Sequence, residues 1–373
     1  MIKKHFVFPL AVLIGSTLAA PGSTAEYIYG SWNGPKNAVI KDGVKPYLDA
    51  VTKETGGTIK WKIIAGGQLF GGRAALAGVR DKVADAGGPI IPAFNRKSLR
   101  AVNVVYDLVN ASTSPVVMAG ATAETMLLDC PECKGDWAKN NTHFLANYST
   151  TRFNVMCREP VKTVDDLKGR KMRVVGALSR LIKSVGAVPI GGPPTKAVQA
   201  LQKGSMDCIV GPISWLQSFG LWDITKHVLD AELALQPTPS SFVVNRDSWK
   251  KMTAAERKSH IKHAPMLVAN TVINGYMAED NEVRAAAKKR GVIITRAGEG
   301  MDRALAAHKK KELKVVPGSA KKQGVKDPEA IVRAHLKNVA KWETIYAKTG
   351  DDAVKFAEAL WTEVYSKLDP NKL

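Results

Sequence analysis

The stretch STTRFNVMCREPVKTVDDLKGRKMRVVG, residues 149–176, contains two apolar runs that predict β-strands. The runs Arg152–Cys157 and Lys171–Val175 are rich in Val, Met and Phe, which favour strands. Pro160 and Gly169 lie between the runs and predict a turn-rich connection. The stretch therefore predicts a strand, an irregular connection and a second strand.

Both runs carry an arginine, Arg152 at the start of the first and Arg173 inside the second. An arginine in the middle of an apolar strand is costly to bury unless an anion contacts it. Its planar guanidinium group matches a carboxylate through two hydrogen bonds. We hypothesise that this pair binds the acid group of a small ligand. The alternative is that each arginine pairs with a nearby acidic side chain or extends into solvent.

The chain that follows this stretch alternates between helical and strand patterns. Residues 177–185 and 195–203 predict helices, and residues 207–210 predict a short strand. This alternation is typical of a parallel sheet. Ligands of such sheets bind beyond the carboxyl ends of the strands, and residues 174–176 and 210–212 are strand ends of this kind.

The region 26–150 also has the pattern of an α/β domain. Its glycine-rich segment, residues 66–72, lacks the G-K-[ST] ending of phosphate-binding loops, so we predict a tight turn at the mouth of a cleft. Strands are expected at 27–32 and 58–64, and helices at 37–55 and 73–81.

The C-terminal third is predominantly helical. Residues 254–290 form an unusually long helical pattern that contains Pro265. This pattern predicts either two helices kinked at the proline or one helix that bridges two domains. The remaining elements are a strand at 292–296 and helices at 301–313, 328–349 and 352–367.

The N-terminus has the pattern of a secretory signal. Lys3 and Lys4 precede an apolar run, residues 6–14, that is too short to span a bilayer. The small residues that end at Ala25 fit a cleavage site, so we expect the mature chain to begin at Glu26. An uncleaved anchor is the alternative.

Length and charge narrow the classes of function. The chain has 373 residues, 45% of them hydrophobic, which is sufficient for one large or two medium domains. Its formal net charge is +20, and +18 without a signal that contains two lysines and no acidic residue. This charge favours anionic partners. Nucleic acid is disfavoured, because we expect the chain to be exported and because its basic residues are scattered rather than interleaved with aromatic residues.

Four cysteines allow up to two disulfides in an oxidising compartment. Cys130 and Cys133 form a C-x-x-C pair without the second ligand pair of a zinc site, so a local disulfide is expected. A Cys157–Cys208 disulfide is the second hypothesis, since both residues lie on predicted strands.

Three motifs occur in a fixed order after residue 164. They are D-D-L-K-G-R-K-M-R at 165–173, G-A-V-P at 186–189 and A-L-Q-K-G-S-M-D at 200–207. Each motif is weak alone, but the series closely resembles the substrate-binding proteins of tripartite ATP-independent periplasmic (TRAP) transporters, of the dicarboxylate-type family. The resemblance covers about residues 26–296, and the helices beyond match only loosely.

The resemblance implies a protein that closes on an organic acid. It implies that Arg173 forms the main salt bridge with the ligand carboxylate and that Arg152 assists. The family commonly has Glu-Asn-Pro where this chain has Val-Gly-Pro at 210–212, and that asparagine contacts the ligand. We therefore expect Gly211 to leave space for an apolar or bulkier ligand, with Trp215 nearby.

The implied fold class is α/β, a two-lobed periplasmic binding protein with a long inter-lobe helix and extra C-terminal helices. After the signal at 1–25, lobe I comprises 26–150 with a return segment at 238–270, and lobe II comprises 151–237 with 271–373. Candidate ligand contacts from lobe I lie at expected strand ends or turns; they are Trp32, Asn33, Gln68 and Phe94.

The sequence thus predicts a periplasmic solute-binding protein of a Gram-negative bacterium, which captures a small carboxylate and delivers it to the membrane subunits of a TRAP transporter. We expect a monomer that uses no cofactor, metal or nucleic acid. A secreted enzyme acting on a small acid is one alternative, although the sequence has no G-x-S-x-G or H-E-x-x-H motif. A cationic protein that binds anions is the other.

Overall fold

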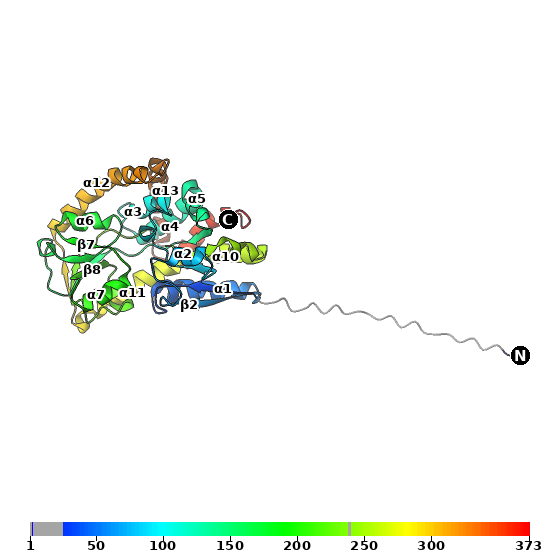
Figure 1. The fold of residues 1–373 in the computed structure, drawn as a ribbon, viewed down its shortest axis with the longest axis horizontal. Helices are drawn as coiled ribbons and strands as arrows, with labels where there is room; N and C mark the ends of the chain where they lie inside the picture. Colours follow the sequence, from blue (N-terminus) through cyan, green and yellow to red (C-terminus); the bar gives the residue numbers. More distant parts are fainter. Residues whose placement is uncertain (1, 3–24, 238–239) are drawn as a thin grey trace.

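The computed structural model describes residue 2, residues 25–237 and residues 240–373. It has two α/β lobes, each built on one β-sheet, as the sequence predicts (Figure 1). The expected export signal lies almost entirely outside the described residues.

Five strands form the sheet of the first lobe, in the order β2-β1-β3-β10-β4. β1 is parallel to β2 and β3, whereas β10 is antiparallel to β3 and β4. On the edge strand β2, apolar residues alternate with Lys60 and Lys62, as expected for a strand with one face in solvent. The strands are β1 (Ala25–Gly30), β2 (Ile59–Ile64), β3 (Ala86–Gly87), β10 (Phe242–Asn245) and β4 (Thr142–Ala146).

Six strands form the sheet of the second lobe, in the order β11-β9-β5-β8-β6-β7. The predicted parallel pairing holds for β6, β7 and β8, but β5 is antiparallel to both of its neighbours. The prediction of a parallel sheet is therefore wrong for β5, which begins two residues after Arg152. The strands are β5 (Asn154–Cys157), β6 (Lys171–Arg173), β7 (Val188–Ile190), β8 (Cys208–Gly211), β9 (His227–Asp230) and β11 (Ile293–Arg296).

The physical reason is the connection between β5 and β6. Parallel neighbours need a crossover that returns the chain to the same end of the sheet, usually a helix. Here the connection contains only the short 3₁₀ segment η4 (Asp165–Leu167), and β5 pairs with β8 instead of β6. Consequently the start of β5 lies beside the carboxyl end of β8.

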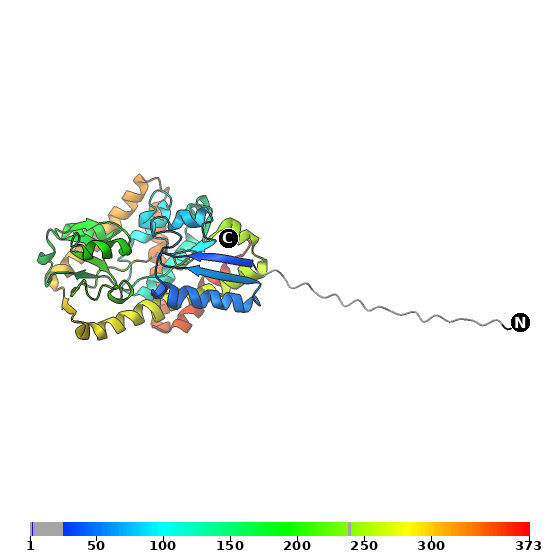
Figure 2. The ribbon, with the colours of Figure 1, turned by 60° about the horizontal axis from the view of Figure 1, so that its bottom comes forward.

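Helices cover the faces of both sheets (Figure 2). In the first lobe, apolar side chains of these helices share one core with β1, β4 and β10. The first-lobe helices are η1 (Val39–Val44), α1 (Lys45–Glu54), α2 (Ala75–Arg80), η2 (Pro92–Phe94), α3 (Arg100–Asp107), α4 (Pro115–Glu124), η3 (Thr125–Asp129), α5 (Pro131–Lys139) and α9 (Arg246–Lys251). The second-lobe helices are α6 (Leu178–Ser184), α7 (Pro194–Gln202) and α8 (Trp215–Ser218).

One long helical segment joins the lobes. It comprises α10 (Ala254–Ala269), the π-helical η5 (Asn270–Met277), α11 (Ala278–Ala287) and the short η6 (Lys288–Arg290), with helical backbone at each junction. α10 packs against α1 of the first lobe, whereas Val283 of α11 belongs to a core of the second lobe. The bridging-helix hypothesis is therefore confirmed, and Pro265 lies within α10.

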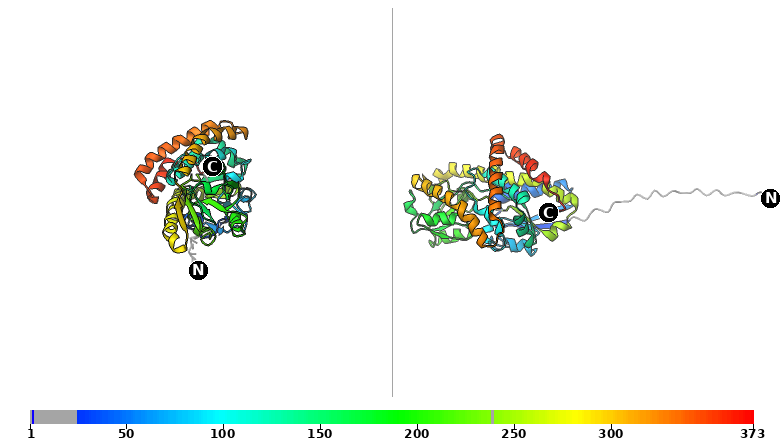
Figure 3. Two further views of the ribbon diagram at one scale, coloured as in Figure 1. Left: turned by 90° about the vertical axis from the view of Figure 1, so that its left-hand side faces the viewer. Right: turned by 90° about the horizontal axis from the view of Figure 1, so that it is seen from above.

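Three further helices follow β11. α12 (Glu299–Lys322) contacts α6 of the second lobe and α3 of the first, so it also spans both lobes (Figure 3). α13 (Pro328–Thr349) and α14 (Ala353–Glu363), followed by η7 (Tyr365–Lys367), pack on α4 and α10 of the first lobe. The sequence-based division instead grouped these helices with the second lobe.

Two disulfides lie within the lobes. Cys157 on β5 is the register partner of Cys208 on β8, their Cα atoms are 4.1 Å apart, and their sulfurs are bonded. Cys130 precedes α5 and bonds to Cys133 in the first turn of that helix, with a Cα–Cα distance of 5.2 Å. The structure thus joins both pairs that the sequence analysis considers.

Candidate ligand-binding site

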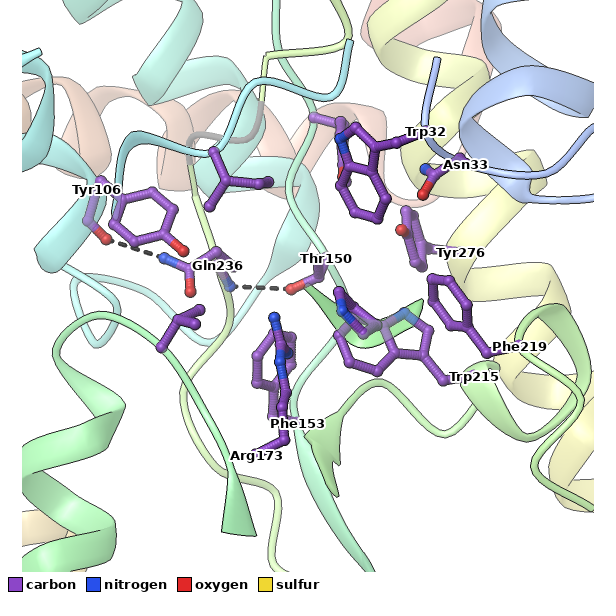
Figure 4. A pocket seen from close by; sticks show the side chains of 14 residues that line it. Trp32, Asn33, Tyr106, Thr150, Phe153, Arg173, Trp215, Phe219, Gln236 and Tyr276 are labelled. Carbon is purple, nitrogen blue, oxygen red and sulfur yellow. Dashed lines mark hydrogen bonds between the residues drawn. The ribbon is translucent and has the colours of Figure 1, made fainter. Parts of the chain in front are cut away.

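A cavity lies where the two lobes meet (Figure 4). Its lining combines one cation with many aromatic rings. Both lobes and the segments that connect them contribute to it. The lining residues are Trp32, Asn33, Ile91, Tyr106, Tyr148, Thr150, Phe153, Arg173, Val175, Pro194, Trp215, Phe219, Gln236 and Tyr276.

Arg173 is the last residue of β6, and its side chain is directed into the cavity (Figure 4). It is only 4% exposed. Nε donates to the carbonyl of Gly192 at 2.8 Å, and Nη1 donates to the carbonyl of Val210 at 3.4 Å. Among the described residues, no carboxylate lies within 4.0 Å of the guanidinium group. Arg173 is therefore a buried cation without a protein counter-ion.

Burial lowers the pKa of Arg173 to about 10, and the nearby Tyr106 acts in the opposite direction. The shift reflects the cost of removing a charge from water without an anion beside it. Because a pKa of about 10 still lies above physiological pH, the group stays protonated. An anion in the cavity would relieve this cost.

Trp215 is the first residue of α8 and lies beside Arg173, whose Cζ is 5.2 Å from the centre of the indole ring. A cation at this distance from an aromatic face is attracted to it. Gly211, at the end of β8, does not line the cavity and lies under the indole instead. The space that we expected beside Gly211 is thus filled by Trp215 itself.

Trp32 and Asn33 line the cavity from the first lobe, as predicted, just beyond the end of β1. Trp32 Nε1 donates to the carbonyl of Pro89 at 2.6 Å. A Cβ at Gly72 would lie 3.2 Å from the indole, so a glycine in this loop lets Trp32 pack closely. Asn33 Nδ2 donates to Oδ1 of Asn37 at 2.9 Å.

Besides Gly211, three predicted ligand contacts lie outside the cavity lining. Arg152 Nη1 is 2.8 Å from Glu232 Oε2. Arg152 therefore pairs with an acidic side chain, which is the alternative that the sequence analysis left open. Gln68 is exposed on the glycine-rich loop. Phe94 packs under the guanidinium of Arg73, 5.1 Å from Cζ to the ring centre. The partners of Arg152 and Phe94 are not evident from sequence spacing.

Several lining residues were not predicted. Tyr106, at the end of α3, Tyr148 and Tyr276 are buried rings whose pKa values are raised by burial. The rings of Tyr148 and Tyr276 stack with their centres 5.4 Å apart. They come from distant parts of the chain, so no local pattern connects them. The sequence does distinguish Gln236, because it is a lone polar residue between an apolar run and a proline.

Thr150 and Gln236 lie on two segments that cross between the lobes. Gln236 N donates to Thr150 Oγ1 at 2.9 Å, and Thr150 N donates to the carbonyl of Gln236 at 3.1 Å. Gln236 Nε2 donates to the carbonyl of Tyr106 at 3.0 Å. The floor of the cavity is therefore a pair of hydrogen-bonded connections between lobes (Figure 4).

Residues 30–314 match the family model of the bacterial extracellular solute-binding proteins, family 7. The chain belongs to this family. The prediction of a TRAP-type solute-binding protein is thereby confirmed. In the part of this solute-binding protein that the structure describes, no helix has the length and apolar character needed to cross a membrane.

Solved structures of TRAP solute-binding proteins resemble this one at low sequence identity. A marine metagenome protein specific for aromatic acid ligands, in complex with 3-hydroxybenzoate, is 22% identical with a TM-score of 0.76, over 86% of this chain and 99% of that one. A Rhodoferax ferrireducens protein with copurified benzoate is 21% identical, with a TM-score of 0.75 over the same shares. A Bordetella bronchiseptica protein with bound (R)- and (S)-mandelate is 20% identical, with a TM-score of 0.71 over 85% and 99%. At such identities the likeness shows the fold alone.

Proposed function

We propose that this solute-binding protein captures a small organic acid in the inter-lobe cavity, with the acid group bound to Arg173, and delivers it to the membrane subunits of a TRAP transporter. The observation that carries the proposal is the buried guanidinium group that no carboxylate of the described residues neutralises. Among these residues no acceptor contacts Nη2 of Arg173, so this atom is available to a ligand oxygen. A bound carboxylate supplies the missing charge and accepts charge-assisted hydrogen bonds.

The ligands of the similar solved structures support an acid of this kind. 3-Hydroxybenzoate, benzoate and mandelate each carry one carboxylate on a small ring-containing body. The cavity offers one arginine surrounded by aromatic side chains, which matches that chemistry. This agreement makes mono-acids with rings the first compounds to test.

A thermal-shift screen of the mature protein against mono- and dicarboxylates, both aliphatic and aromatic, tests the proposal. An acid at 100 times its Kd should add about 2.7 kcal/mol to the free energy of unfolding. Calorimetry on each hit then gives the Kd. If no acid in the panel shifts the melting temperature at millimolar concentration, the proposed ligand class is wrong.

We also propose that the protein binds and releases its ligand unchanged. The family consists of solute-binding proteins, which supports binding without turnover. The test is to incubate protein with each hit for hours and record the NMR spectrum of the small molecule. The appearance of a product would favour the alternative of a secreted enzyme.

Export with cleavage after Ala25 is the remaining part of the proposal. It rests on the charged start, the short apolar run and the small residues before Glu26. Mass spectrometry of protein isolated from the periplasm should find Glu26 as the first residue. A retained Met1 would contradict cleavage.

A further inference from the structure

Gly211 and Trp215 form a close pair at the carboxyl end of β8. A Cβ added at Gly211 would lie 2.2 Å from Cε3 and 2.4 Å from Cζ3 of the Trp215 ring. Real Cβ atoms do not approach other atoms this closely, so any side chain at position 211 displaces the indole. The backbone of Gly211 is not in the left-handed region, so the space, not the backbone conformation, requires a glycine.

Trp215 is held in this place by its neighbours. Its backbone N donates to the carbonyl of Pro212 at 3.1 Å, which closes the turn between β8 and α8. Phe219 meets the indole edge to face, with ring centres 5.2 Å apart and an interplanar angle of 85°. Phe153 packs against it at 5.9 Å. The ring is 6% exposed and forms a fixed wall of the cavity (Figure 4).

The Trp215 ring lies beside Arg173. Among the described residues, Arg173 is the only lysine or arginine that lines the cavity. Among the described residues the lining contains no acidic side chain, and its polar groups other than Arg173 are uncharged. A ligand carboxylate at Arg173 therefore places the rest of the ligand among aromatic rings. A flat ring gains contact there, whereas a second carboxylate would lose its water without gaining a cation.

We propose that Gly211 is a specificity-determining position, which seats Trp215 beside the acid site so that the cavity selects aromatic monocarboxylates over dicarboxylates. This inference rests on the proposed function, because it assumes that Arg173 binds the acid group. Gly211 acts through Trp215 and is a positioning residue.

Three acids test the inference by calorimetry. Benzoate is a flat aromatic acid, cyclohexanecarboxylate has the same size without the flat ring, and succinate carries a second carboxylate. The wild-type protein should bind benzoate about tenfold more tightly than cyclohexanecarboxylate and at least about 100-fold more tightly than succinate.

The variants separate the role of the pair from general stability. Gly211→Ala should displace the indole and reduce the preference for benzoate over cyclohexanecarboxylate to within about threefold. Trp215→Leu removes the wall and should give the same loss, and the double variant should lose no more than Trp215→Leu alone. Gly135→Ala on α5 is the matched control, since an added Cβ there has no atom within 4 Å, and it should keep the wild-type preference.

The preference ratio is the deciding measurement, because a purely structural defect weakens binding of both acids alike. If Gly211→Ala does not fold, Trp215→Leu alone decides, since it relieves crowding instead of adding it. A wild-type protein that binds these acids but favours succinate overturns this inference and leaves the proposed function intact, as does an unchanged preference in Trp215→Leu. Failure to bind any acid overturns both.

Discussion

At position 173 a guanidinium group is held by two backbone carbonyls and meets no acidic side chain among the described residues. Arg173→Ala removes the cation that a bound carboxylate needs, and leaving a buried charge unpaired costs about 3–5 kcal/mol. We therefore expect affinity for the screened acid to fall by roughly two to three decades. Calorimetry on the folded variant measures this.

Two other arginine variants sharpen that prediction. Arg173→Lys should recover only part of the affinity, because an ammonium keeps the charge but loses the planar fork. Arg152→Ala is the matched control, since Arg152 pairs with Glu232 outside the cavity and such partly exposed pairs contribute about 0–1 kcal/mol. Binding by Arg173→Ala within threefold of wild type would place the carboxylate elsewhere.

The two arginines illustrate what sequence predicts at this scale. Arg173 is recognisable because it interrupts an apolar strand, and the structure places it in the cavity. Arg152 has a similar local setting, but Glu232, its partner, lies 80 residues later in the chain. Tyr148 and Tyr276 meet only in three dimensions, so no local pattern predicts them. Local spacing thus identifies an unusual residue and not its partner.

Among the helices, α13 packs on α4 and buries His335 completely. His335 Nδ1 lies 3.2 Å from Thr125 Oγ1, and burial lowers the pKa of the imidazole to about 4. The unfolded chain binds this proton near pH 6.5 and the folded chain only near pH 4. The unfolded state therefore holds more protons between these values, and the free energy of unfolding falls as the pH falls through this window.

His335→Asn tests this linkage, because an amide keeps one polar partner for Thr125 and does not titrate. Urea unfolding at pH 7, 6, 5 and 4.5 should show that the wild type loses up to about 1.4 kcal/mol more per pH unit than the variant. The difference should appear only below about pH 6.5. Parallel pH profiles of the two proteins would mean that the imidazole is not held neutral in the folded state.

The two disulfides close loops of very different length. Cys157 and Cys208 are 51 residues apart, whereas Cys130 and Cys133 are 3 apart. In the chain-entropy description, the longer loop stabilises by about 4 kcal/mol and the shorter by about 2 kcal/mol. Denaturant unfolding of the two double Cys→Ala variants should therefore show the larger loss for the 157/208 pair. Four reactive thiols in denatured, unreduced periplasmic protein would contradict both bridges.

Helices and strands were predicted well where the periodicity of apolar residues agrees with the glycine and proline residues that end an element. The expected helix at 328–349 matches α13 in both bounds, and the long pattern at 254–290 is continuous. Strand direction was the failure, because it depends on which strands pair and not on their composition. β5 has the apolar content of its neighbours, yet it runs antiparallel to β8 and β9, because the connection that follows it contains only η4 and no crossover helix.

Four segments of the described chain connect the two lobes: the irregular segments that contain Thr150 and Gln236, the helix at 254–290, and α12. α13 and α14 pack on helices of the first lobe, whereas the sequence-based division groups them with the second. We propose that these two helices move with the first lobe, in place of the sequence-based grouping with the second. The contacts of distant helices follow from surface complementarity, which the sequence does not show directly.

Ligand-dependent closure is the prediction for the whole molecule. The cavity is lined from both lobes, and Trp32, Arg173 and Trp215 are almost fully buried, so we expect an acid to enter when the lobes separate. The crossing pair at Thr150 and Gln236 can act as a hinge, because few residues there must change backbone angles. Ligand bound to Arg173 then holds the lobes together.

Small-angle X-ray scattering on the mature protein measures this closure. The radius of gyration should decrease when the best acid from the screen is added to saturation. Arg173→Ala at the same ligand concentration is the control and should keep the ligand-free value, because its affinity is lower by roughly two to three decades. Since closure is a rigid-body rotation, the far-ultraviolet circular dichroism should stay constant while the scattering profile changes. A wild-type profile that does not change at saturation would contradict a hinge and would require another route into the cavity.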